Sequence, residues 1–301
     1  MIQTRRHFLS ASAGLAAGSL AFAAAKDEIS LAAWSIVNSF RAGKWKNLDL
    51  PRLCRDEFRV TGLEFVNQFF ENPTLNYLQQ LKQNGRDYGI TFVRIMVDNE
   101  GNMAAVDKAE RMQAAVAHRK WVDIAHYLGC RDIRCNMRGE RPDWKQDKDL
   151  INRAAESFQD LLEYSKGSSL DIVIENHGGA SSDPDILVGL MKAVNNPRFG
   201  TLPDFGNTNP GDDPYEVLRK LMPYAKGVSV KASWAEDGTH PRYDLEKMIK
   251  ICQEFGYKGF WGIESSFGRR SRPATPDEIW QNEVKGVMLT RAVIERTVMK
   301  G

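Results

Sequence analysis

The sequence has almost no net charge and few histidines. Its 41 Lys and Arg residues nearly balance 39 Asp and Glu residues, and only five histidines occur in 301 residues. A balanced surface offers no electrostatic attraction to nucleic acid or to an anionic membrane. A metal-dependent nuclease would need a basic face and several histidine ligands, so the sequence disfavours that class.

Cysteine is also scarce, and its spacing forms no metal or redox motif. Cys54, Cys130, Cys135 and Cys252 include no C-x-x-C pair. Cys130 and Cys135 belong to one expected strand, where their separation prevents a bond between them. A domain of this length does not need a disulfide for stability, so we expect buried thiols.

Long apolar runs are missing after the N-terminus, where a targeting signal is predicted. Thr4-Arg5-Arg6-His7-Phe8-Leu9 is a twin-arginine pattern, and an Ala-rich run with A-x-A cleavage sites follows from Ala11 to Ala25. The run is too short and too rich in alanine for a membrane span. We expect residues 1–25 to be an export signal, cleaved or kept as an anchor, and the protein to be periplasmic or secreted. Residues 26–301 would then form a single domain.

Strand-like and helix-like segments alternate after the signal. Apolar runs predict strands at 29–35, 60–66, 90–97, 132–136, 172–179, 199–204, 227–231 and 259–264. Amphipathic segments predict helices at 74–88, 105–128, 147–166, 245–255 and 275–298, with further helices starting at Asp183-Pro184 and Asp213-Pro214. Eight such units, with no G-x-G-x-x-G after the first strand, favour a closed (β/α)8 TIM barrel over an open doubly wound sheet.

Three of the predicted strands end in a carboxylate. Glu175, Asp204 and Glu264 follow apolar runs, and strand ends on one side of a barrel form its active-site mouth. With alternating side chains, His177 would share the inward face of Glu175. Three acids in one mouth repel each other unless a cation neutralises them. A divalent metal with oxygen ligands is the simplest solution; Mn²⁺ or Mg²⁺ suits carboxylates best, with Zn²⁺ as an alternative.

The motifs at these strand ends resemble those of the xylose isomerase-like TIM-barrel family, the sugar phosphate isomerase/epimerase group. They are the Glu at 175, Pro-Asp-Phe-Gly-Asn at 203–207, Val-Ser-Val-Lys at 228–231 and Gly-Tyr-Lys-Gly-Phe-Trp-Gly-Ile-Glu at 256–264. The resemblance implies that Glu175, Asp204 and Glu264 bind the metal.

The same resemblance implies that Glu175 and Glu264 are the acid/base pair. The family's usual histidine ligand on the seventh strand is replaced here by Ser229, while Lys231 is kept, and Asn207 stands where a histidine often follows the sixth strand. Water or His177 would complete a three-carboxylate site, or else Lys231 would supply the cation.

The resemblance therefore implies a metal-dependent sugar isomerase or epimerase with Glu175, Glu264 and Lys231 as catalytic residues. Its small-molecule substrate would be a free sugar or a keto-glycoside, because sugar phosphates are mainly cytoplasmic. A keto-sugar lyase or dehydratase, or a non-catalytic carbohydrate-binding barrel, are the alternatives, and the oligomeric state stays open. The candidate substrate-binding residues are His177, Asn207, Ser229, Trp234, Asn136 and Glu64.

Overall fold

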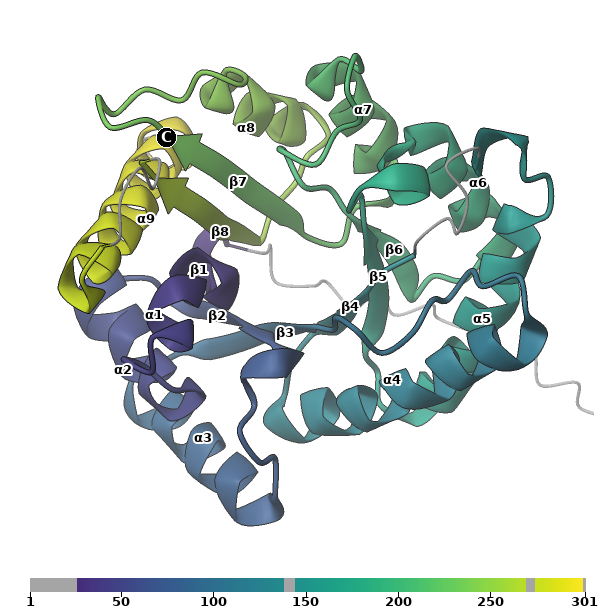
Figure 1. Ribbon diagram of the computed structural model, residues 1–301, viewed down its shortest axis with the longest axis horizontal. Coiled ribbons are helices and arrows are strands. Elements are labelled where there is room, and N and C mark those ends of the chain that lie inside the picture. The colour runs from purple at the N-terminus through teal and green to yellow at the C-terminus, as the bar shows by residue number, and fades with distance from the viewer. Residues whose placement is uncertain (1–25, 138–143, 269–273, 300–301) are drawn as a thin grey trace, which may run out of the picture.

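A computed structural model describes residues 26–137, 144–268 and 274–299 of the chain. One sheet of eight parallel strands is surrounded by helices (Figure 1). The strands are β1 (Glu28–Ala32), β2 (Gly62–Val66), β3 (Thr91–Met96), β4 (Asp132–Cys135), β5 (Asp171–Glu175), β6 (Phe199–Leu202), β7 (Val228–Trp234) and β8 (Phe260–Phe267). The α-helices are α1 (Val37–Arg41), α2 (Leu50–Leu53), α3 (Leu75–Asp87), α4 (Lys108–Leu128), α5 (Leu150–Tyr164), α6 (Pro184–Val194), α7 (Pro214–Leu221), α8 (Leu245–Glu254) and α9 (Pro276–Val298). The predicted segment of residues 1–25 lies outside the described residues.

The strands are hydrogen-bonded in the order β6-β5-β4-β3-β2-β1-β8-β7, and backbone hydrogen bonds join the two edges. The N–H of Ser229 donates to Pro203 O at 2.9 Å, and the N–H of Phe205 donates to Ser229 O at 3.1 Å. Asp204 and Ser229 also form a single parallel bridge. The sheet thus curls round until its edges meet, which is consistent with the expected TIM barrel.

Two predicted helix starts use an aspartate followed by proline. The side chain of Asp183 accepts from the N–H of Asp185 at 2.9 Å, and that of Asp213 accepts from the N–H of Tyr215, also at 2.9 Å. The proline fits the first turn because the amide it lacks would have no partner within the helix. Both expected helix starts, before α6 and α7, are confirmed.

The fifth and sixth strands end earlier than expected. β5 ends at Glu175, and Gly178 then turns the chain with a φ of +87°. β6 ends at Leu202, where Pro203 has no N–H with which to continue the ladder. His177 and Asp204 therefore lie in the loops after their strands, and the prediction that placed them within strands is wrong.

Two other regions differ from the prediction. β7 and β8 run beyond Lys231 and Glu264 and stay paired as far as Trp234 and Phe267. Between β1 and β2, where no helix was predicted, the chain forms α1, α2 and a π-helical turn at Cys54–Phe58. These short turns have too few residues for the helical periodicity to be read from sequence.

Alternate residues of β8 face opposite sides of the sheet, as expected. A Cβ on Gly262 would lie 2.5 Å from Glu64 Oε1, so Gly262 faces the inside of the curled sheet. Trp261 and Ile263 have the opposite parity and are fully buried in the apolar core beneath the helices. Glu264 shares the parity of Gly262 and points inward one layer higher.

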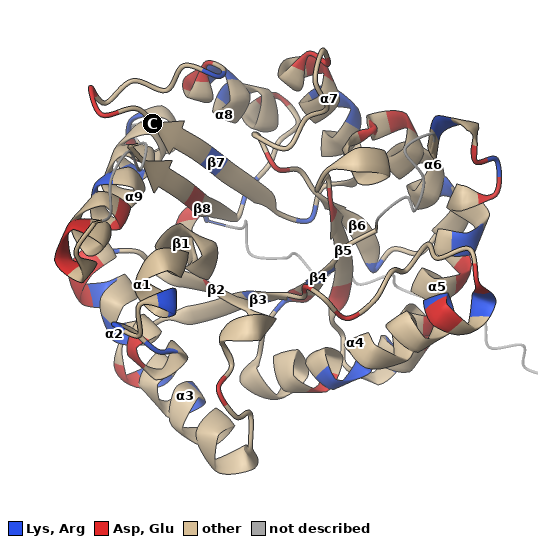
Figure 2. Cartoon of the chain, in the orientation of Figure 1, with Lys and Arg blue, Asp and Glu red and all other residues tan. Residues whose placement is uncertain are grey.

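The cysteines and the surface agree with the composition. All four cysteines are free and buried, as predicted. Lys, Arg, Asp and Glu are interspersed over the outer helices and loops in this view (Figure 2). Among the described residues, no helix is both long and apolar enough to span a membrane.

Candidate active site

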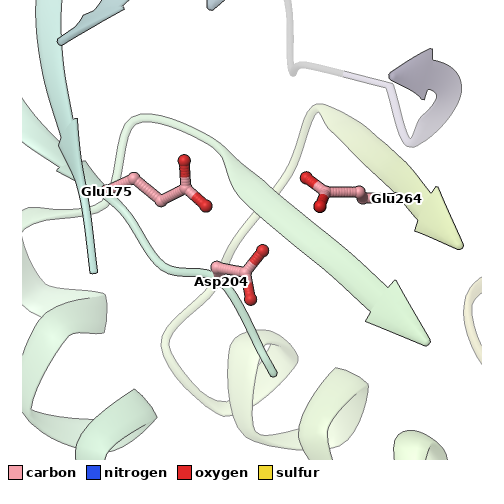
Figure 3. A group of neighbouring side chains, drawn as sticks. All are labelled: Glu175, Asp204 and Glu264. Carbon is pink, nitrogen blue, oxygen red and sulfur yellow. The ribbon is translucent and has the colours of Figure 1, made fainter. Parts of the chain in front are cut away.

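Three carboxylates meet at the C-terminal ends of the strands. Glu175 ends β5, Asp204 follows β6 and Glu264 belongs to β8. One carboxylate oxygen from each lies within 4.8 Å of the others. Their side chains point toward one another (Figure 3). Glu175 and Asp204 are buried, while Glu264 keeps 17% of its side-chain surface exposed, so the cluster opens to solvent on the β8 side.

The two carboxylate oxygens of Glu175 have different surroundings. Oε1 accepts a hydrogen bond from Asn207 Nδ2 at 2.9 Å. Oε2 lies 2.9 Å from Arg134 Nε, but the N–H of Arg134 is not aligned with it. Within the described part of the chain, Oε2 therefore accepts no hydrogen bond. A buried acceptor without a donor is costly, so this atom is available to a ligand.

Asp204 is held by hydrogen bonds on both oxygens. Oδ1 accepts from the N–H of Gly206 at 2.8 Å, and Oδ2 accepts from Ser229 Oγ at 2.8 Å. The amide of Asn176 bonds the backbone on both sides of Asp204, accepting from its N–H at 2.7 Å and donating to its carbonyl at 2.9 Å. This residue is thus fixed in position although no strand contains it.

Glu264 is paired with a lysine. Lys231 Nζ lies 2.5 Å from Glu264 Oε1 and 3.6 Å from Asp204 Oδ2. Both residues of the pair are in register, since Lys231 of β7 lies opposite Glu264 of β8. Among the described residues, Lys231 and Arg134 thus bring two positive charges to the three carboxylates.

Burial and crowding shift the pKa values of these groups. Burial raises the pKa of Asp204 to about 7, although Lys231 opposes the shift. Burial also raises the pKa of Glu175, with Glu264 acting in the same direction and Arg134 against it. Burial alone would lower the pKa of Lys231, but Asp204 and Glu264 raise it above its usual range. Because the lysine stays charged, it balances the carboxylates around it.

Comparison with known proteins identifies the architecture. The model of the "Xylose isomerase-like TIM barrel" family matches residues 57–290. The chain belongs to this family. No curated protein matches the chain.

Solved structures share the fold of this xylose isomerase-like barrel at low identity. A xylose isomerase domain protein from Planctomyces limnophilus is 16% identical with a TM-score of 0.66, over 91% of this chain and 99% of that one. D-Allulose 3-epimerase from Methylomonas sp. is 13% identical with a TM-score of 0.69, over 91% and 99%. A xylose isomerase-like TIM barrel protein from Mycobacterium smegmatis, in complex with magnesium, is 15% identical with a TM-score of 0.61, over 89% and 97%.

Inside the xylose isomerase-like barrel, a charged layer lies below the carboxylates. Glu64 Oε1 accepts from Ser30 Oγ at 2.6 Å, and Glu64 Oε2 lies 3.6 Å from Arg94 Nε. Arg94 Nη2 is 3.3 Å from Asp132 Oδ2. Glu64, a candidate for substrate contact, thus belongs to this fully enclosed layer and not to the mouth.

The arginines of the interior were not predicted from sequence. Arg134 is buried between Glu175 and Asp98, with Nη1 at 2.7 Å from Asp98 Oδ1. A usable signal existed: Arg94 interrupts a largely apolar strand and Arg134 lies between Ile133 and Cys135, and a charge in such a place needs a buried partner.

The remaining candidates lie at different distances from the carboxylates. Asn207 and Ser229 bond Glu175 and Asp204 directly. Asn136 Nδ2 donates to Asp98, at the mouth beside Arg134. The indole of Trp234 donates to Thr290 Oγ1 of α9 at 2.9 Å, which ties its ring to the outer helix layer.

His177 is half-buried in the loop after β5, beside the carboxylates of Glu175, Asp204 and Glu264. Its backbone N–H donates to Ser181 Oγ at 2.9 Å. Burial lowers the pKa of its imidazole, and the positive charge of Arg134 acts in the same direction. This shift favours the neutral ring, in which one nitrogen can donate a hydrogen bond and the other can accept one.

Proposed function

We propose that this protein is an isomerase or epimerase that moves the proton next to the carbonyl of a free sugar or a keto-glycoside. One observation carries the proposal: Glu175 and Glu264 approach the same point from non-adjacent strands, with Asp204 within 4.8 Å of both. A substrate carbon bound next to that point would have a carboxylate on each of two sides. The names of the structural neighbours, which include D-allulose 3-epimerase and L-ribulose 3-epimerase, support this class of reaction.

The surroundings of the two glutamates suit proton transfer. Oε2 of Glu175 accepts no hydrogen bond from the described residues and lies next to Arg134, so it can receive a proton while its charge is balanced. Glu264 Oε1 is 2.5 Å from the ammonium of Lys231, whose positive charge offsets that of the carboxylate. Return to the same carbon from the opposite side gives an epimer, and return to the neighbouring carbon gives an isomer.

The three carboxylates also fit a divalent cation. They offer oxygen donors from three separate segments, within 4.8 Å of one another. Oxygen donors of this kind suit Mn²⁺ or Mg²⁺, with Zn²⁺ as the alternative. When bound by Glu175, Asp204 and Glu264, the ion would polarise the sugar carbonyl and stabilise the enediolate charge.

Solvent-deuterium exchange tests the proposed reaction. Free keto- and aldo-sugars are incubated in D₂O with protein and Mn²⁺, and NMR locates the exchanged carbon. We expect exchange at a single carbon with the wild type and a loss of about 100-fold or more in Glu175→Gln and Glu264→Gln. Glu254→Gln is the matched control, because Glu254 pairs with Arg219 on the outer surface.

The same experiment separates the rival functions. Loss of a β-substituent together with exchange would make the protein a lyase or dehydratase. Sugar binding that is unchanged in both glutamate variants, with no exchange and no bound divalent ion, would leave only a carbohydrate-binding barrel and would refute the proposed enzyme.

We also propose that the chain is exported through its twin-arginine pattern. Arg5 and Arg6 carry the pattern. Replacing both with lysine should keep the protein in the cytoplasm, as measured by cell fractionation. Unchanged export of this variant would refute the proposal.

A further inference from the structure

The ammonium of Lys231 already contacts two of the three carboxylates proposed to bind a metal. Its Nζ lies 2.5 Å from Glu264 Oε1 and 3.6 Å from Asp204 Oδ2. An ammonium has no lone pair and cannot itself bind a metal, so it competes for the same oxygens. A divalent ion on those oxygens would also repel the neighbouring positive charge.

The stem of the Lys231 side chain is packed, while part of the side chain is open to solvent. An added Cβ on Gly206 would lie 2.9 Å from Lys231 Cδ, so the aliphatic stem packs against the bare backbone at Gly206. Tyr243 Oη donates to the backbone carbonyl of Lys231 and holds the start of the stem. The side chain keeps 25% of its surface exposed, so solvent reaches part of it.

A second side chain of β7 also contacts an oxygen of the carboxylate cluster. Ser229, two residues before Lys231 and on the same face of β7, donates to Asp204 Oδ2 at 2.8 Å. Lys231 and Ser229 thus both contact Asp204 Oδ2, and each contact uses part of the binding capacity of that oxygen.

We infer that Lys231 and a divalent cation are alternative occupants of the carboxylate cluster. When the cation binds, the ammonium leaves Glu264 and turns into the mouth, where it faces the substrate oxygen. Without the cation, Lys231 would balance the charge of the carboxylates. With the cation bound, it would donate a hydrogen bond to the substrate. This inference rests on the proposed metal centre.

Calorimetric titration of the metal-free protein with Mn²⁺ tests the inference. We expect Lys231→Met to bind Mn²⁺ about tenfold or more tightly than the wild type, because the competing ion pair is gone. Lys226→Met is the matched control: Lys226 pairs with Asp171 at 3.1 Å, before the start of β7 and away from the mouth. It changes the net charge equally and should leave Mn²⁺ affinity unchanged.

A second variant keeps the charge of the lysine. Gly206→Ala would push on the Lys231 stem and weaken the contact with Glu264, so we expect tighter Mn²⁺ binding, although by less than in Lys231→Met. It also keeps the test valid if Lys231→Met fails to fold. Equal affinity of the wild type, Gly206→Ala and Lys231→Met would overturn the inference. If none of these proteins bound Mn²⁺, the proposed metal centre itself would be refuted.

Discussion

The guanidinium of Arg134 lies between two buried carboxylates, with Nε 2.9 Å from Glu175 Oε2 and Nη1 2.7 Å from Asp98 Oδ1. Arg134 is 1% exposed, so water screens neither contact. A fixed positive charge at this distance favours the ionised form of Glu175, whereas burial disfavours it. Arg134 is thus a positioning residue for the proposed base.

Replacing Arg134 with methionine should change both stability and the pH profile. Removing one partner of a buried ion pair costs about 3–5 kcal/mol of the free energy of unfolding. Without the guanidinium the pKa of Glu175 should rise, so the acidic limb of the exchange-rate profile should move to higher pH. Denaturant unfolding and pH-dependent deuterium exchange measure the two effects. A variant that lost stability but kept its pH profile would show a purely structural role.

Replacing glycine with alanine should lower the free energy of unfolding more at Gly262, inside the sheet, than at Gly167, in the turn after α5. A Cβ at Gly262 would lie 2.5 Å from Glu64 Oε1 and 3.0 Å from Val228 O, so Gly262→Ala should cost about 1–3 kcal/mol. No atom lies within 4 Å of a Cβ at Gly167, and its φ is not positive. Gly167→Ala should therefore be neutral or stabilising by up to about 1 kcal/mol. Urea unfolding of both variants measures the two changes in the free energy of unfolding. Equal changes would contradict the close packing of Gly262 against Glu64.

The buried Asp132 should make stability depend on pH. Burial raises the pKa of Asp132 to about 7, despite Arg94 3.3 Å away. Because an unfolded aspartate has a pKa of about 3.9, the folded state holds an extra proton between these values. This contribution to stability is complete at low pH and is lost as the pH rises, by about 1.4 kcal/mol per pH unit.

Comparison of the wild type with Asp132→Asn isolates this effect from other titrating groups. The extra proton makes the free energy of unfolding of the wild type fall as the pH rises. The variant lacks this proton, so between about pH 4.5 and 6.5 its free energy of unfolding should fall less than that of the wild type, or should rise. Urea unfolding across this range measures both slopes. Parallel curves would mean that Asp132 is ionised throughout the range.

Replacing Trp234 with phenylalanine should affect stability and leave substrate binding intact. The indole N–H donates to Thr290 Oγ1, and losing this bond costs about 1 kcal/mol. The ring is tied to α9, so the KM for any sugar found in the exchange assay should not change. A large rise in KM with unchanged stability would instead assign Trp234 to the substrate.

Part of the fold and site could be predicted because the signals are local. The helix starts at Asp183-Pro184 and Asp213-Pro214 follow from capping chemistry over a few residues. The inward parity of Glu264 follows from alternation along β8. The predicted ends of two strands were wrong because alternation along a strand does not show where the strand ends. Pro203 ended β6 before Asp204, and Gly178 turned the chain near His177.

The sequence by itself determined the eight units, the three carboxylates at their ends and the likeness to the xylose isomerase-like barrel, because short-range periodicity and motif spacing encode them. Only the tertiary structure decided which cation faces which acid. Arg134 with Glu175 and Lys231 with Glu264 are pairs across neighbouring strands, and sheet closure and register set their distances. Such pairings depend on contacts between residues far apart in the chain, which no local pattern specifies.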